Sequence, residues 1–207
     1  MLAPKGAFLL TIMGHYFTND QLESKPTQFT FQYHGHELIF NSDSGVFSKT
    51  FIDYGSRVLL DAVEIKDAKT LLDLGCGYGT LGITLKALNP QLHVTMVDVN
   101  RRAISLAKEN ITCNNLDNID VYESNIYEHV ENTFDMILSN PPIRAGKKVV
   151  HTILEEAYDH LNEGGRLVVV IRKKQGAPSA QAKMKEVFGN CEILKKDKGY
   201  YILQSYK

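Results

Sequence analysis

Polar and apolar side chains alternate along residues 27–33 (Thr-Gln-Phe-Thr-Phe-Gln-Tyr). A period of two is typical of a β-strand with one buried face. His34-Gly35, a pair suited to a tight turn, follows and leads into a second apolar run that ends at Phe40. The pattern therefore predicts a β-hairpin over residues 27–40.

Strand-like and helix-like segments alternate through the rest of the chain. The strand-like ones are short, apolar and rich in β-branched residues, as expected for a parallel sheet covered on both faces. The predicted strands are 70–74, 93–97, 119–122, 134–138, 166–171, 192–194 and 200–203, and the predicted helices are 52–63, 81–88, 103–113, 150–161 and 180–188. The last two strands are joined by residues 195–199, a link too short for a helical crossover. The sequence predicts an α/β fold with a mostly parallel seven-stranded sheet that ends in an antiparallel hairpin.

The residues before the first hairpin carry no sustained periodicity. Residues 7–12 are apolar, but the run is short and no small-residue cleavage site follows it, which disfavours a signal peptide. We predict a flexible tail over residues 1–26, with Met13 as the natural start, and a single domain over residues 27–207. No apolar run approaches the roughly 20 residues that a membrane-spanning helix needs, so no membrane partner is expected.

Composition and charge narrow the class of protein. The chain is 43% hydrophobic and 23% charged, as in ordinary globular domains. Its three cysteines are widely spaced, which suits a reducing cytoplasm better than a disulfide framework. The net charge of −1 divides into +6 for residues 140–207 and −7 for residues 1–139. This asymmetry fits either a face that meets a polyanion or ordinary solvated lysines.

A glycine-rich segment follows the first predicted strand of the parallel sheet. It reads Gly75-Cys-Gly-Tyr-Gly79 and precedes a predicted helix. Glycines allow a tight turn and close approach of the backbone to a ligand. About 20 residues further on, Asp98 ends the next strand, where a carboxylate can accept hydrogen bonds from ribose hydroxyls. The alternative role for Asp98 is to cap the following helix.

Two details of this segment indicate which cofactor it would bind. The spacing of Gly75, Gly77 and Gly79 departs from the dinucleotide fingerprint, so a dehydrogenase is the weakest interpretation. Asp73 lies two residues before the first glycine. A carboxylate there would repel a pyrophosphate but suits a cationic amino-acid group. The segment resembles the first motif of class I methyltransferases, a resemblance that implies bound S-adenosylmethionine.

The fourth strand of the sheet ends in Ser139-Asn-Pro-Pro-Ile143. An exocyclic amine on a nucleobase is a poor nucleophile because its lone pair is delocalised into the ring. The side-chain oxygen of Asn140 and the carbonyl of Pro141 can accept its two N–H bonds and draw the nitrogen toward tetrahedral geometry. Pro141 and Pro142 lack N–H donors and hold the backbone in one conformation. A simple turn at a strand end is the alternative interpretation.

Two groups of cationic residues lie beside these motifs. They are Arg144, Lys147 and Lys148 after the acceptor turn, and Arg172, Lys173 and Lys174 at the end of the fifth strand. Both groups follow parallel strands, so they are expected at the same edge of the sheet as the ligands. They would form a positive rim for phosphates, or else be ordinary charges on solvated loops.

Further stretches make the chain similar, from about Phe29 onward, to the small-subunit ribosomal RNA guanine-N2 methyltransferase C family, and most of all to its short single-domain members. Those stretches, besides the two motifs above, are Asp43-Ser-Gly-Val-Phe-Ser48, Asp53-Tyr-Gly-Ser56, Arg144-Ala-Gly-Lys-Lys148, Lys174-Gln-Gly-Ala177 and Lys198-Gly-Tyr200. The resemblance implies a Rossmann-like fold and methyl transfer to an RNA base, with ribosomal RNA or the assembled small subunit as partner. No metal ion is expected, because His34 and His36 have no third ligand at a suitable spacing.

The resemblance also implies a set of site residues. Asn140, Pro141 and Pro142 would be catalytic, and Ile143, Arg144, Lys147, Lys148, Lys173 and Lys174 would contact the substrate. The cofactor would contact Phe47, Ser48, Asp53, Asp73, Gly75, Gly77, Gly79, Asp98, Asn125 and Asn140. For Phe47 and Ser48, a core side chain and a helix cap remain the alternative roles.

The chain departs from the family pattern at two positions. Many amino-group methyltransferases carry an aromatic residue after the prolines that stacks on the flipped base, where this chain has Ile143. Asn125 stands where members often have an acid that contacts the adenine amino group, a role its amide oxygen could keep. The pair Tyr200-Tyr201 is interpreted as strand packing and not as a stacking platform. Cys76 is interpreted as a small buried residue rather than a reactive thiol.

Three other functions remain open from the sequence. A protein-amide methyltransferase and an adenine-N6 methyltransferase use a similar acceptor turn. A ribosome-associated RNA-binding protein that keeps the fold without turnover is the third. Retention of both the glycine loop and Asn140 favours an active enzyme.

Overall fold

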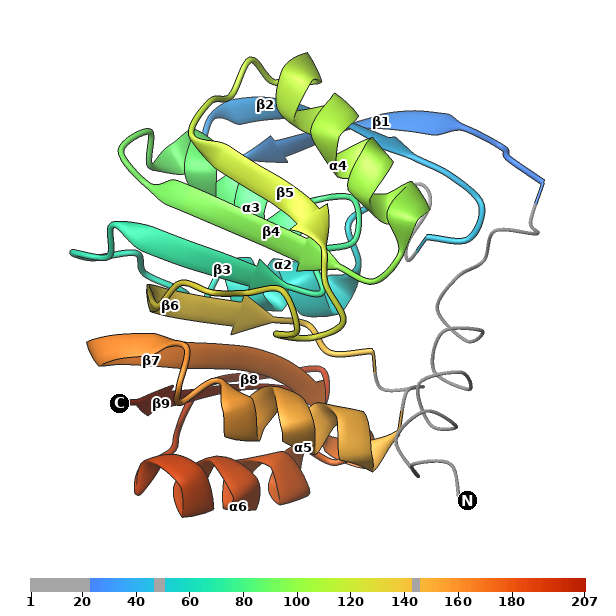
Figure 1. Cartoon of the computed structure of the whole chain (residues 1–207). Helices are drawn as coiled ribbons and strands as arrows, with labels where there is room; N and C mark the ends of the chain where they lie inside the picture. Colours follow the sequence, from blue (N-terminus) through green and yellow to red (C-terminus); the bar gives the residue numbers. More distant parts are fainter. Residues whose placement is uncertain (1–22, 47–50, 143–145) are drawn as a thin grey trace, which may run out of the picture.

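The centre of the molecule is a seven-stranded sheet in the order β5-β4-β3-β6-β7-β9-β8 (Figure 1). The computed structural model describes residues 23–46, 51–142 and 146–207. The strands are β3 (Thr70–Leu74), β4 (His93–Asp98), β5 (Ile119–Glu123), β6 (Phe134–Ser139), β7 (Leu161–Arg172), β8 (Glu192–Asp197) and β9 (Tyr200–Tyr206). Strands β3 to β7 run parallel, and β9 runs antiparallel to both β7 and β8. The predicted fold class is confirmed.

Helices cover both faces of this sheet. The helices are α2 (Tyr54–Leu60), α3 (Thr80–Leu88), α4 (Arg101–Cys113), α5 (Lys147–Glu156), the 3₁₀ helix η2 (Lys173–Gln175) and α6 (Ala177–Phe188). Helices α2, α3 and α4 share one apolar cluster with the sheet, and α5 and α6 share the other. Neighbouring strand residues point to opposite faces, so Leu71 belongs to the first cluster and Leu72 to the second. Burial on both faces explains why the strands read as nearly continuous apolar runs.

The N-terminal hairpin forms a separate two-stranded sheet of β1 (Thr27–Tyr33) and β2 (His36–Ser42). Asn110 of α4 and Asn114, the C-cap of that helix, fasten it to the domain. The Asn110 side chain accepts from the backbone nitrogen of Asn41 at 2.6 Å and donates to its backbone oxygen at 3.0 Å. Asn114 does the same with Ile39, at 2.9 Å and 2.7 Å. The exposed backbone of an edge strand is thereby paired by side chains.

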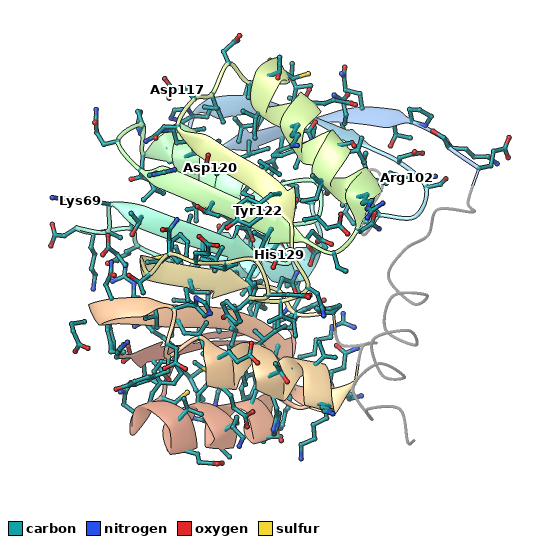
Figure 2. The ribbon with its side chains drawn as sticks, in the orientation of Figure 1. Lys69, Arg102, Asp117, Asp120, Tyr122 and His129 are labelled. Carbon is teal, nitrogen blue, oxygen red and sulfur yellow. The ribbon has the colours of Figure 1, made fainter. Side chains whose placement is uncertain are left out.

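The segment after β2 is held at the start of α4. Arg102 donates to the backbone oxygen of Ser44 at 2.7 Å and lies 3.7 Å from the carboxylate of Asp43. Figure 2 shows Arg102 at the end of α4 that faces this segment. Asn100 donates to the backbone oxygen of Gly45 at 3.2 Å. The hairpin therefore brings residues 43–46 to the carboxyl end of β4.

Several element boundaries differ from the predicted ones, most of all between residues 147 and 161. The helix expected at residues 150–161 begins earlier, at Lys147, and ends at Glu156, while Leu161 already belongs to β7. The chain leaves the helix through i→i+3 backbone bonds, such as that from the His160 nitrogen to the Ala157 oxygen. Leu161 then pairs with Phe134 of β6. An isolated leucine suits helix and strand equally, so the local pattern did not separate the two.

Within the described ranges, no helix is both long and apolar enough to span a bilayer. Those same ranges contain no cluster of three or more potential metal-ligating side chains. Residues 1–22 of the predicted tail lie outside the described residues.

Candidate active site

The three glycines after β3 have different surroundings. Gly75, Gly77 and Gly79 all adopt positive φ, at 75°, 57° and 95°. A Cβ on Gly75 or Gly77 would meet nothing within 4 Å, whereas one on Gly79 would lie 2.6 Å from the Ile83 side chain. The first two glycines therefore border an open space that a side chain would fill, and the third allows the loop to pack against α3. A cradle of bare backbone suits an extended cofactor such as S-adenosylmethionine.

Asp98 connects the end of β4 to this loop. Its carboxylate accepts from the backbone nitrogen of Gly77 at 2.8 Å and from that of Asn100 at 2.8 Å. Burial raises the pKa of Asp98, and its backbone hydrogen bonds oppose that rise. A carboxylate has about four acceptor positions, so capacity remains for ribose hydroxyls. The cap of α4 is Asn100, which accepts from the backbone nitrogens of Arg102 and Ala103, so the alternative role expected for Asp98 is filled by another residue.

Asp73 lies beneath the loop and not on its surface. The residue is 1% exposed, and its carboxylate accepts from the backbone nitrogen of Gly82 in α3 at 2.9 Å. Burial, together with the nearby charge of Asp98, raises the pKa of Asp73 to about 7. The described contacts of Asp73 therefore fasten α3 to β3.

The acceptor turn lies next to the glycine loop. Leu74, the last residue of β3, pairs with Ser139, the last residue of β6. The Ser139 hydroxyl donates to the backbone oxygen of Leu74 at 2.8 Å. Pro141 after the turn is buried, and Pro142 is exposed. The two motifs that the sequence separates by more than sixty residues therefore leave the sheet side by side.

Asn140 is held by its amide nitrogen. That nitrogen donates to the Asp53 carboxylate at 3.2 Å and to the Ser56 hydroxyl at 3.0 Å. The carboxylate can only accept, so the orientation of the amide is determined. Among the described residues, no group donates to the Asn140 side-chain oxygen, which is left to accept from a ligand.

Asp53 and Ser56 belong to the first turn of α2. Asp53 caps this helix by accepting from the backbone nitrogen of Ser56 at 3.1 Å. Asp53, predicted to lie near the cofactor, thus also contacts the acceptor side of the site. Ser56 was not among the predicted site residues. Its signal in the sequence was a serine in the first turn of α2, three residues after the capping acid.

The other predicted site residues that the structure describes follow strands at the same edge of the sheet. Asn125 lies two residues after the end of β5. The residue before it, Ser124, donates from its backbone nitrogen to the Asp98 backbone oxygen at 3.0 Å, which brings Asn125 close to the end of β4. Lys147 and Lys148 occupy the first turn of α5, Lys173 and Lys174 lie in η2 after β7, and all four are exposed. Phe47, Ser48, Ile143 and Arg144 lie outside the described residues.

A mostly parallel sheet of this topology, with a glycine cradle, an acid after the next strand and an Asn-Pro-Pro turn at one edge, defines a class I methyltransferase. The chain belongs to the methyltransferase small domain family, which it matches over residues 37–204. It is an S-adenosylmethionine-dependent methyltransferase, and the resemblance expected from its motifs is confirmed.

Three similar proteins illustrate the relationship. The uncharacterized protein YbxB of Bacillus subtilis is 43% identical over 197 residues, which cover 93% of this chain and 98% of YbxB. Ribosomal RNA small subunit methyltransferase C of Erwinia tasmaniensis is 33% identical over 90% of this chain and 56% of its own length. The T. thermophilus 16S rRNA N2 G1207 methyltransferase, solved in complex with AdoMet and guanosine, superposes with a TM-score of 0.79 at 26% identity, over 90% of this chain and 52% of that one. The chain spans about half the length of these methyltransferase C relatives.

Proposed function

We propose that this enzyme methylates the exocyclic N2 amino group of a guanine in small-subunit ribosomal RNA. The anchored amide of Asn140 carries the proposal, because its nitrogen is occupied by Asp53 and Ser56 while its oxygen points to no described donor. The similarity to methyltransferases C supports guanine N2 as the acceptor.

The Asn140 oxygen and the carbonyl of Pro141 accept the two N–H bonds of the amino group. This arrangement orients the nitrogen lone pair away from the turn and reduces its conjugation with the ring. When bound, S-adenosylmethionine supplies a methyl group on a positively charged sulfur. That methyl group would be transferred to the amino nitrogen held by Asn140 and Pro141, and the nitrogen would release one proton to water. Asp53 and Ser56 act as positioning residues, because they touch Asn140 and not the base.

On the cofactor side, Gly75 and Gly77 provide the cradle, and Asp98 and Asn125 accept from the ribose and the adenine amino group. On the RNA side, Lys147, Lys148, Lys173 and Lys174 contact phosphates. Lysines in the first turn of α5 are disfavoured by the helix dipole. A bound polyanion offsets that cost, which supports a phosphate contact there.

The test uses methyl-labelled S-adenosylmethionine with three acceptors: naked small-subunit ribosomal RNA, assembled small subunits and total protein. Labelled RNA is digested to nucleosides, and Asn140→Ala serves as the control. We expect the label in N2-methylguanosine with the parent enzyme and its loss in the variant. Label confined to N6-methyladenosine or to protein would overturn the proposed acceptor. Cofactor binding without transfer to any of the three would instead favour a binding protein.

A further inference from the structure

Two tyrosines and two cations gather beside the Asn140 anchor. The guanidinium carbon of Arg172 lies 4.6 Å from the ring centre of Tyr200, and the Lys198 ammonium lies 4.7 Å from that of Tyr54. The two rings are 5.7 Å apart and tilted by 47°. We refer to these four residues as the Tyr200 cluster.

The cluster lies at the edge of the sheet where the proposed site is. Tyr200 is the first residue of β9 and pairs with Arg172, the last residue of β7. The Tyr200 ring packs on Gly55 so closely that a Cβ there would lie 2.9 Å from its Cε1. Gly55 stands between Asp53 and Ser56, the two residues that hold Asn140. The absence of a side chain at position 55 thus lets an aromatic ring reach the acceptor side of the site.

Hydrogen bonds hold the cluster in place. The turn between β8 and β9 is formed by Lys198 and Gly199, both at positive φ. The Gly199 oxygen accepts from the backbone nitrogen of Lys173 at 2.7 Å, which ties the turn to η2. The Tyr54 hydroxyl donates to the Asp197 carboxylate at 2.8 Å. Support from two sides means that little side-chain entropy remains to be lost when a ligand binds.

The two cations of the cluster, Arg172 and Lys198, are exposed, whereas Tyr54 and Tyr200 are half-buried, and Arg172 is the one with a flat charged group. It is exposed, and it forms no ion pair with any residue that the structure describes. Its guanidinium is nevertheless kept over the Tyr200 ring. A flat cation without an anionic partner, beside the exposed Lys173 and Lys174, is complementary to a nucleotide, because RNA bases stack on arginine planes as well as on aromatic rings.

Building on the proposed function, we propose that the target base stacks on the guanidinium of Arg172, which Tyr200 holds in place. The base is then gripped by its face while its amino group is held by Asn140. In this proposal Tyr200 packs in its strand and also supports Arg172, and it does not itself stack on the base. Phe51, two residues before Asp53 and 66% exposed, is an aromatic residue outside the cluster and serves as the comparison.

The test measures binding of 2-aminopurine riboside, a purine whose fluorescence falls when it stacks. The full chain, with S-adenosylhomocysteine present, is compared with Arg172→Lys, Tyr200→Leu, Tyr200→Phe and Phe51→Leu. We expect quenching by the parent protein, Tyr200→Phe and Phe51→Leu at similar affinity. Arg172→Lys and Tyr200→Leu are expected to bind about tenfold or more weakly, since base stacking contributes roughly that much. Arg172→Lys keeps the charge but loses the plane, so its loss separates stacking from a phosphate contact.

Several results would overturn the proposal: no quenching by the parent protein, parental affinity in Arg172→Lys or Tyr200→Leu, or loss only in Phe51→Leu. Melting temperature and S-adenosylhomocysteine affinity show which variants are folded. If Tyr200→Leu is unfolded, the comparison of Tyr200→Phe with Arg172→Lys still tests the proposal. Methyl transfer to RNA is measured in parallel. If Arg172→Lys transfers the methyl group with unchanged kcat and KM, the proposed function stands and the stacking role of Arg172 is overturned. If quenching depends on Arg172 but no guanine is methylated, the stacking role stands and the proposed function is overturned.

Discussion

Replacing Ser56 with alanine removes one of the two hydrogen bonds that orient the Asn140 amide. Ser56 is 4% exposed, and its hydroxyl accepts from Asn140 at 3.0 Å. Asn140 keeps its bond to Asp53, and its second N–H loses the acceptor that Ser56 provides. A neutral hydrogen bond of this kind contributes about 0.5–1.5 kcal/mol. If that energy acts in the transition state, kcat falls about 2- to 12-fold, because each ~1.36 kcal/mol is tenfold in rate.

The assay is single-turnover methyl transfer at saturating cofactor. S-adenosylhomocysteine affinity is expected to stay at the parental value, because Ser56 is assigned to the acceptor side. Ser205→Ala is the matched control, since this fully buried serine donates a 2.7 Å bond to the Asn190 oxygen near the C-terminus. We expect Ser205→Ala to lower stability by a similar amount without slowing turnover. Parental turnover in Ser56→Ala, or equal slowing in both variants, would refute the reasoning.

Three further predictions concern the cofactor side. Gly77→Ala is expected to weaken cofactor binding with a stability cost of about 1–2 kcal/mol, because its Cβ would enter the open space at positive φ. Gly82→Ala is expected mainly to destabilise the fold, by about 1–3 kcal/mol, because its Cβ would overlap buried side chains. Calorimetric titration measures the loss of cofactor affinity and thermal melting measures the loss of stability. Weaker cofactor binding in Gly82→Ala than in Gly77→Ala would contradict this assignment. The folded-state pKa of Asp73 is raised from 3.8 to about 7, so the native state retains a proton that the unfolded state has released, and stability should fall as the pH rises across that window. Denaturant unfolding from pH 5 to pH 8 should show this decline in the parent protein and a smaller decline in Asp73→Asn, in which the raised pKa of Asp98 still acts. Parallel curves would argue against it. An alkylating reagent should modify the exposed Cys113 and spare Cys76, because burial raises the pKa of the Cys76 thiol. Mass spectrometry identifies the modified cysteines, and rapid labelling of Cys76 would contradict its burial.

The strands of the parallel sheet could be predicted within a residue or two from the chain alone, apart from the early start of β7 at Leu161. Their apolar runs exist because both faces of the sheet are covered, so these buried strands can be recognised from their amino-acid composition. The neighbouring positions of the glycine loop and the Asn140 turn were predictable for a related reason. Parallel strands end at a common edge, and each motif follows one of them directly.

Contacts between distant elements were decided only by the tertiary structure. Ser56 lies 84 residues from Asn140, and Asn110 lies 69 residues from the strand backbone that it pairs. Tyr200 shows the reason most clearly. Its strand was predicted, but a shift of one residue in register would turn its ring to the opposite face. The packing of α2 against β9 selects the observed face, and Gly55 permits the approach because it has no Cβ. Local patterns specify which elements form, whereas the side chains that meet across elements depend on a register and packing that no local pattern contains.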